Sequence, residues 1–118
     1  MELVAFVGSD TENWGQVTAL MKRMSDAHTY LIKNKHAPAF PSSQNSTLIE
    51  VDSSLPLREF KDSLQEKLKS KLSGDFEVAL SLASGTGKEH MALIAALLNL
   101  PVGIRLVIFT KDGIEYIT

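Results

Sequence analysis

Cysteine is absent from this chain of 118 residues, which excludes disulfide bonds, thiolate metal sites and a thiol nucleophile. An excess of positive charge is also absent, because 12 lysines and arginines stand against 14 aspartates and glutamates, giving a net charge of -2. That balance argues against binding to duplex nucleic acid through a basic face, although it leaves room for a small anionic ligand in one pocket. No apolar run approaches the ~20 residues of a membrane span, so we expect no membrane partner.

The length of the chain predicts one domain over residues 1–118, large enough to bury a core and too short for a catalytic domain with a separate regulatory one. Met1 leads directly into strand-like sequence rather than into a signal peptide. We therefore expect a cytoplasmic protein, and we expect any effector to lie on another chain.

Two kinds of apolar pattern alternate along the chain and predict an α/β fold. Nearly continuous apolar runs are typical of buried strands, and apolar residues spaced three or four apart are typical of amphipathic helices. The sequence Lys111-Asp112-Gly113 predicts a hairpin turn between the last two strands. Strands are predicted over residues 2–7, 28–33, 47–51, 76–82, 102–109 and 113–117, and helices over 11–24, 56–72 and 88–98.

This order predicts a small Rossmann-like three-layer sandwich, with a mostly parallel sheet and a C-terminal antiparallel hairpin. In such sheets the strand order reverses between the first strand and the fourth, and ligands bind beyond the carboxyl ends of the strands at that switch point. We therefore expect Gly8-Ser9-Asp10, which follows the first strand, to lie across one crevice from residues 84–88, which follow the fourth.

The turn Ser84-Gly85-Thr86-Gly87-Lys88 joins an apolar strand to a helix and is suited to hold an anion. Backbone N–H groups of Gly85, Thr86 and Gly87 can face a phosphate without a side chain in the way. The positive end of the helix dipole points to the same place, and Lys88 adds a full charge. A nucleotide or oligonucleotide ligand is the first expectation.

Two other interpretations of this turn stand beside phosphate binding. A P-loop needs a glycine where Leu82 stands and a serine or threonine where Glu89 stands, so an ATPase is not expected. A purely structural turn is the other interpretation, because Thr86 and Glu89 match a capping box. A second capping box is predicted for Ser9 and Glu12, at the start of the first helix.

The helix over residues 88–98 has almost no polar side, because residues 91–98 read Met-Ala-Leu-Ile-Ala-Ala-Leu-Leu. A helix on one face of a small sheet shows such a pattern when its outer side meets another surface. We infer from this pattern a homodimer formed through the helix.

The element order and two motifs resemble the CARF (CRISPR-associated Rossmann fold) domains, which are sensors of the cyclic oligoadenylate messengers of type III CRISPR defence. The motifs are the turn with Ser9 and the stretch Ser84-Gly85-Thr86-Gly87-Lys88 followed by Met91, which is similar to the family's Thr-Gly-Gly-Thr-Lys-x-Met. The chain departs from that pattern in the inverted pair Thr86-Gly87 and in having His90 where the family has methionine. These departures leave the ring size of the ligand open.

This resemblance implies a dimer through the helix after the lysine motif, with one cyclic ligand, expected to be cyclic tetra-adenylate, held where the two symmetric loops meet. In ring nucleases of the family a ribose 2′-hydroxyl attacks its own phosphate, and the resemblance assigns assistance in this metal-independent cleavage to Ser9 and Lys88. The expected ligand-binding residues are Gly8, Ser9, Asp10, Trp14, Ser84, Gly85, Thr86, Gly87 and Lys88.

Other candidate residues have weaker claims to a role. Trp14 lies close to the first turn and can either stack on an adenine or simply pack its helix. His28, His36 and His90 lack metal-ligand spacing, so neither a metal nor another cofactor is expected. The polar loop around residues 36–46 is a candidate cover for a site.

Three functions are compatible with these residues. They are a standalone ring nuclease, a non-catalytic binding module for cyclic oligoadenylate, and a Rossmann-like domain that binds another phosphate-bearing metabolite. The lack of an effector sequence favours the first, because an enzyme that removes a messenger needs no attached output.

Overall fold

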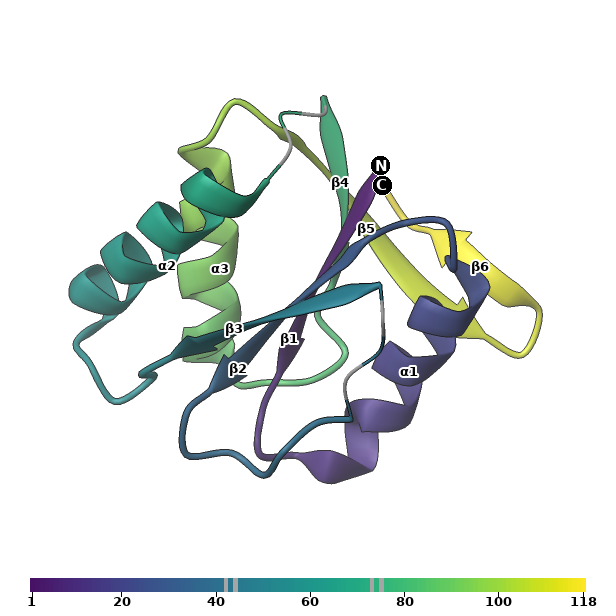
Figure 1. The fold of residues 1–118 in the computed structure, drawn as a ribbon, viewed down its shortest axis with the longest axis horizontal. Helices are drawn as coiled ribbons and strands as arrows, with labels where there is room; N and C mark the ends of the chain where they lie inside the picture. The colour runs from purple at the N-terminus through teal and green to yellow at the C-terminus, as the bar shows by residue number, and fades with distance from the viewer. Residues whose placement is uncertain (42, 44, 73, 75) are drawn as a thin grey trace.

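A computed structural model gives the structure of the chain and describes residues 1–41, 43, 45–72, 74 and 76–118. The elements in chain order are β1 (Glu2–Val7), η1 (Thr11–Asn13), α1 (Trp14–Arg23), β2 (Thr29–Asn34), β3 (Ser46–Val51), α2 (Leu57–Lys71), β4 (Glu77–Ser81), α3 (Gly87–Leu98), β5 (Gly103–Thr110) and β6 (Gly113–Tyr116). The strands form one sheet in the order β3-β2-β1-β4-β5-β6 (Figure 1). Neighbouring strands are parallel except β5 and β6, which pair antiparallel as the hairpin signal predicts.

Helices cover both faces of the sheet, so the molecule has three layers (Figure 1). On one face α2 and α3 enclose a core that contains Phe6, Phe60 and Leu80. On the other face α1 packs over Leu3 and Leu31. The strand β1 is buried along its whole length, as its continuous apolar run predicts. The predicted Rossmann-like sandwich is therefore confirmed.

The strand β1 lies between β2 and β4, so the strand order reverses between β1 and β4 as predicted. The register pairs Val7 with Lys33 of β2 and Ala5 with Ser81 of β4. Because these strands are parallel, their carboxyl ends reach the same edge of the sheet. The turns that follow them are brought together at that edge.

The apolar pattern of α3 is explained largely within the chain, because α3 packs against α2 and the sheet. Met91 and Leu98 remain 59% and 70% exposed, so only the strip that includes them is left for another surface. The apolar residues of α3 that are buried in the core are Ala92, Leu93, Ala96 and Leu97.

The capping box predicted for Ser9 and Glu12 is wrong. The chain enters α1 through η1, and neither Asp10 nor Asn13, the two N-cap residues, makes a side-chain cap hydrogen bond. Asp10, and not Ser9, stands at the N-cap of η1. Its carboxylate does not cap the helix start, because it accepts hydrogen bonds from the turn after β4 and from the side chain of Asn13.

Candidate functional site

The turns that follow β1 and β4 are in direct contact. A Cβ added to Gly8 would lie 2.8 Å from the Cα of Gly85. Gly85 itself has a φ of +109°, and a Cβ there would lie 3.0 Å from Cδ1 of Phe6. The ring of His90 closes the second turn, with its Nε2 2.7 Å from the carbonyl oxygen of Ser84. Glycine is required in both turns because the two backbones approach so closely.

Asp10 ties the first turn to the second. Its Oδ1 accepts hydrogen bonds from the hydroxyl of Ser84 at 2.7 Å and from the N–H of Gly85 at 3.0 Å, while Oδ2 accepts from Asn13 at 2.7 Å. Ser84 is fully buried, and its Oγ also accepts from the N–H of Gly8 at 2.9 Å. The sequence predicts Gly8 and Ser84 as ligand contacts. In the structure they instead form buried hydrogen bonds that hold the two turns together.

The hydrogen bonds to Asp10 keep its carboxylate charged. Burial acts to raise the pKa of Asp10, but the bonds from the Asn13 side chain, the Ser84 hydroxyl and a backbone N–H outweigh it, so the pKa lies below its ordinary value of 3.8. A fixed negative charge therefore stands between the two turns at neutral pH.

The start of α3 has the complete capping box that the sequence predicts. Thr86 Oγ1 accepts from the N–H of Glu89 at 3.2 Å, and Glu89 Oε1 accepts from the N–H of Thr86 at 2.8 Å. The other carboxylate oxygen of Glu89 accepts from the hydroxyl of Ser53 at 2.6 Å, which links α3 to the turn after β3. Glu89 is only 5% exposed, and a carboxylate so buried requires donors on both oxygens.

These bonds correct the prediction that the N–H groups of Gly85, Thr86 and Gly87 all face a phosphate. The N–H groups of Gly85 and Thr86 donate to the carboxylates of Asp10 and Glu89, so they are not available to a ligand. Gly87 and Lys88 occupy the first two positions of α3, where a backbone N–H has no acceptor within the helix. An anion at this helix start therefore meets the N–H groups of Gly87 and Lys88.

The side chain of Lys88 reaches from α3 to the turn before α2. Its Nζ donates to the carbonyl oxygens of Ser53 at 2.7 Å and of Leu55 at 2.6 Å. An ammonium group has three hydrogens, so one remains for a ligand while both bonds persist. Lys88 can reach a phosphate at the edge of the site, and a closer approach requires it to leave a carbonyl.

A polar hollow of about 560 Å³ opens at the carboxyl ends of the parallel strands. We call it the switch-point hollow. Both Ser9 and Lys88, which are exposed, belong to its lining. The residues that line it are Ser9, Asp10, Asn34, Ser53, Ser54, Gly85, Thr86, Lys88 and Glu89.

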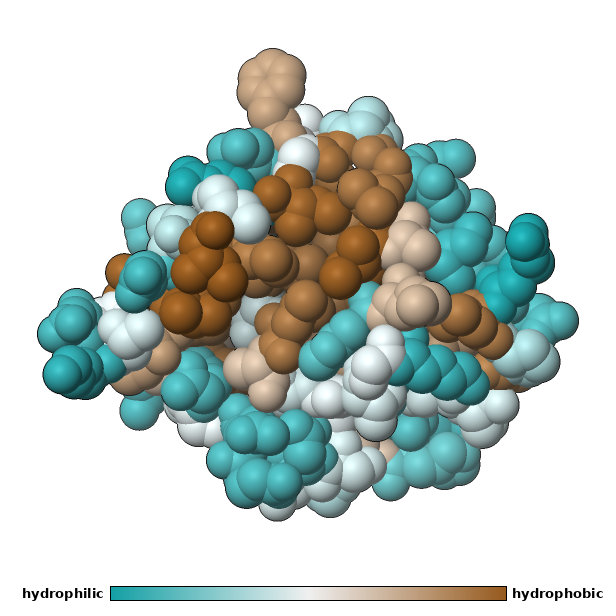
Figure 2. Space-filling view, turned by 180° about the vertical axis from the view of Figure 1, so that it is seen from behind, coloured by the Kyte–Doolittle hydropathy of each residue, from teal (hydrophilic) through white to brown (hydrophobic). Residues whose placement is uncertain are grey.

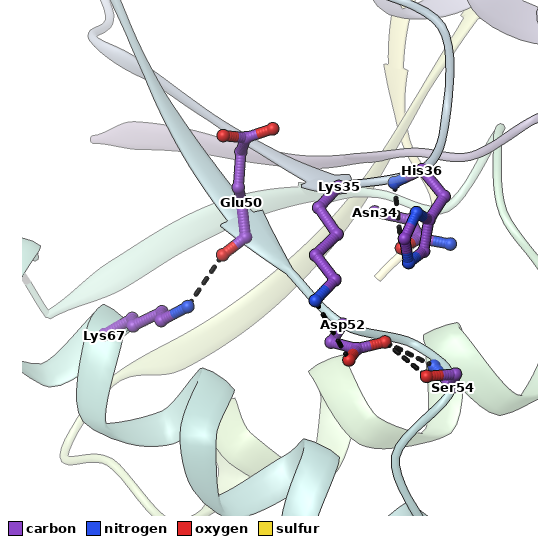
Figure 3. Close-up of polar contacts among 7 residues, drawn as sticks. All are labelled: Asn34, Lys35, His36, Glu50, Asp52, Ser54 and Lys67. Atoms are coloured by element: carbon purple, nitrogen blue, oxygen red, sulfur yellow. Dashed lines mark hydrogen bonds and ion pairs between the residues drawn. The ribbon is translucent and has the colours of Figure 1, made fainter.

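The residues at the carboxyl ends of β2 and β3, which include Asn34 and Ser54 of the lining, form what we call the rim of the hollow (Figure 3). Asp52 Oδ1 accepts from the N–H and the hydroxyl of Ser54, and Asp52 Oδ2 lies 3.3 Å from Nζ of Lys35. The side-chain and backbone bonds from Ser54, with a smaller effect of Lys35, lower the pKa of Asp52 to about 2. Asn34 stands beside this rim, where its Oδ1 accepts a long bond of 3.4 Å from the N–H of His36.

Trp14 lies behind the first turn rather than in the lining of the hollow. Its Nε1 donates to the carbonyl oxygen of Gly8 at 3.0 Å, and its ring centroid lies 5.1 Å from that of Phe40. Ala37, in the same loop as Phe40, is buried. The described part of the loop over residues 36–46 is therefore anchored beside α1, and the contacts of Trp14 are those of a packing residue.

Four lining residues were not predicted as site residues. The sequence places Ser53 and Ser54 in a connection between a strand and a helix, and it places Asn34 at the end of a strand. It predicts for Glu89 only a role in the capping box. The position of Ser53, Ser54 and Asn34 could have identified them, since each lies at or just beyond the carboxyl end of a parallel strand, at the same edge of the sheet as the end of β1.

The fold and the hollow define the class of this molecule, a small Rossmann-like α/β protein with a polar hollow at its switch point. Comparisons with protein-family models, with curated proteins and with solved structures found no match. Within the described residues, no helix is long and apolar enough to cross a membrane, and no cluster of three or more potential metal-ligating side chains occurs. The function is therefore argued from the geometry of the hollow.

Proposed function

We propose that the protein binds a cyclic oligoadenylate messenger in the switch-point hollow. The observation that carries this proposal is the combination of the start of α3, the ammonium group of Lys88 and the hydroxyl groups of Ser9 and Ser54 around one hollow. A phosphodiester suits the N–H groups and the ammonium group, while ribose hydroxyls suit serine side chains. The volume of about 560 Å³ lies within the ordinary range of small-ligand sites, roughly 300–1,000 Å³.

The proposal includes a homodimer in which two copies share one ligand. Figure 2 shows a broad apolar area on the side of the molecule that is turned away in Figure 1. Exposed Met91 and Leu98 of α3 and Ile108 of β5 contribute to the apolar surface of these two elements. The surface includes the helix whose N-terminus faces the hollow, and a shared ligand requires a two-fold contact in which both copies of this helix point the same way, so that the two hollows lie on the same side of the dimer.

The dimer is tested by placing a charge on this surface. Leu98→Glu should give a monomer, because dimer formation would bury an unpaired carboxylate. Leu48→Glu is the matched control, because Leu48 is 47% exposed on the edge strand β3. Sedimentation at micromolar concentration should show a dimer for the wild type and for the control. A wild-type protein that stays monomeric with saturating ligand would contradict the shared site.

Cleavage of the bound ring is the second part of the proposal. Ser9 would orient the ribose or the phosphate, while Lys88 and the N–H of Gly87 stabilise the charge that develops as the 2′-oxygen attacks phosphorus. The products carry 2′,3′-cyclic phosphate and 5′-hydroxyl ends. Turnover should be slow, because every carboxylate oxygen of Asp10 and Glu89 already accepts a hydrogen bond, which makes both poor general bases.

Binding without cleavage is the second candidate function, and the position of Lys88 favours it. The two carbonyl bonds hold Nζ toward the turn before α2. Ligand binding can use the remaining hydrogen, whereas stabilisation of a transition state requires a closer approach. A protein that only sequesters the messenger could therefore keep both hydrogen bonds from Lys88 to the carbonyl oxygens of Ser53 and Leu55.

Incubation with cyclic tri-, tetra- and hexa-adenylate in excess EDTA, followed by chromatography, separates the two candidates. Ring opening that is lost in Lys88→Ala and reduced in Ser9→Ala would support the nuclease. Tight binding with every ring intact after long incubation would leave the binding module. Failure of all three rings to bind in titration calorimetry would overturn the proposed function.

A further inference from the structure

We propose that the switch-point hollow selects phosphodiesters, which carry one negative charge per phosphate, and discriminates against phosphomonoesters, whose phosphate carries about 1.5–2 charges at neutral pH. The inference rests on the proposed function and adds the class of ligand that the same site excludes. Oligoadenylates with a terminal phosphate belong to the disfavoured class, and nucleoside triphosphates are disfavoured for the same reason, because their terminal phosphate also carries a second ionisable oxygen.

The charges that line the hollow are the first reason. Among the described lining residues, Lys88 supplies one positive charge and Asp10 and Glu89 supply two negative charges. On the rim, Lys35 already pairs with Asp52 at 3.3 Å, so its charge is largely neutralised. A phosphate in the hollow therefore meets one lysine and the start of one helix, with carboxylates close to both.

The two carboxylates are fixed in place, which is the second reason. Asp10 is held by three donors, and Glu89 is held by the N–H of Thr86 and the hydroxyl of Ser53. Neither can turn away from an approaching anion without breaking bonds between the turns. The oxygens of the partly exposed Asp10 retain lone pairs that can accept a ribose hydroxyl, so a group that repels a dianion also suits a sugar.

The donors in the hollow match a single negative charge. A helix start is equivalent to roughly half a positive charge, and the ammonium group of Lys88 adds one. A second charge on the phosphate is attracted by the same Lys88 and helix start, but it is also repelled by Asp10 and Glu89 and costs more to remove from water, and the described lining offers no further cation to offset these two costs. At the separations within one small site this repulsion corresponds to about a tenfold loss of affinity.

Titration calorimetry with a matched pair of ligands tests the inference on the wild-type protein. The pair is linear tetra-adenylate with a 3′-hydroxyl and the same chain with a 3′-phosphate, measured beside cyclic tetra-adenylate and ATP. At about pH 7.5 the 3′-phosphate form should bind about tenfold more weakly than the 3′-hydroxyl form, and ATP should compete poorly. At about pH 5 the gap should narrow, because a phosphomonoester with a second pKa near 6 then carries one charge.

A substitution at Asp10 supplies the second arm of the test. Asp10→Asn keeps the shape of the side chain and retains an acceptor for Ser84 and Gly85 but removes the negative charge. The difference in affinity between the two linear ligands should therefore become severalfold smaller. Asp112→Asn removes the same charge from the exposed turn between β5 and β6 and should leave the gap as it is. Should Asp10→Asn fail to fold, the pH series on the wild type still decides.

The outcomes separate this inference from the proposed function. Equal affinity of the two linear ligands at about pH 7.5, or a gap that does not respond to pH, would overturn the selection while leaving ligand binding intact. Binding of the 3′-hydroxyl chain without binding of any cyclic ligand would overturn the proposed function and support the selection, provided that the 3′-phosphate form binds more weakly. If no adenylate binds, both are overturned.

Discussion

The turns after β1 and β4 are built alike, from a strand, a glycine and a helix start, yet they are stabilised in opposite ways. The second turn is capped by its own residues, because Thr86 and Glu89 form a complete capping box. The first turn has no side-chain cap, and Oδ1 of Asp10 instead accepts hydrogen bonds from Ser84 and Gly85 of the second turn. The first turn is therefore stabilised by its hydrogen bonds to the second turn, whereas the second turn is stabilised by its own residues. We call the bonds from Ser84 and Gly85 to Asp10 the tie between the turns.

The largest effect is expected where the two turns touch. Gly85→Ala should destabilise the protein by about 2–4 kcal/mol, because φ is +109° and the new Cβ would lie 3.0 Å from Phe6 Cδ1. Gly87→Ala is the matched control, since a Cβ there meets nothing within 4 Å. Urea unfolding measures both. Equal stability of the two variants would mean that the contact between the turns is not tight.

Removal of the bonds that Asp10 accepts from Ser84 and Gly85 should have the next largest effect on stability. Asp10→Ala should lower the free energy of unfolding by about 1–3 kcal/mol, because it leaves the buried hydroxyl of Ser84 without its acceptor. A double-mutant cycle with Ser84→Ala isolates the bond. Additive effects of the two substitutions would contradict the proposed coupling between the turns.

The same tie predicts a dependence of stability on pH. Folding lowers the pKa of Asp10, so its stabilising contribution is fully present above the unfolded-state pKa of about 3.9 and is lost as the pH falls through the lower folded-state pKa. The difference in unfolding free energy between wild type and Asp10→Asn should therefore shrink between about pH 5 and pH 2. Urea midpoints across that range measure it, and a difference that grows on acidification has the wrong sign.

The smallest effect is expected from removing the N-cap side chain of α3. Thr86→Ala should cost about 1 kcal/mol, the usual effect of losing an N-cap side chain. Glu12→Ala, at the position where the first capping box was predicted, should stay within about 0.5 kcal/mol of wild type. Thermal unfolding of the two variants provides the measurement. A larger loss in Glu12→Ala would show that the start of α1 is capped in solution.

The strands and helices could be predicted because their signals are local. The continuous apolar run of β1 and the spaced apolar residues of α2 identify buried surfaces without any knowledge of partners. The meeting of the two turns could also be predicted, since it follows from the reversal of a parallel sheet.

The tie between the turns could not be predicted. Asp10 and Ser84 lie 74 positions apart, and the nearby pair Ser9 and Glu12 offers a local pattern that competes with the long-range bond. The apolar pattern of α3 likewise does not say whether a second chain or α2 covers it. Sequence patterns report that a group needs a partner, and the tertiary fold decides which partner it finds.

Titration calorimetry with cyclic tetra-adenylate decides whether the start of α3 and Lys88 hold a phosphate. Lys88→Ala should weaken binding by about 1–3 kcal/mol, the scale of a lost charge-assisted bond, with little change in thermal stability because the side chain is exposed. Lys22→Ala, on the exposed side of α1, should bind as the wild type does. Unchanged affinity in Lys88→Ala, or loss of folding in place of affinity, would reduce the turn to a structural connection between β4 and α3.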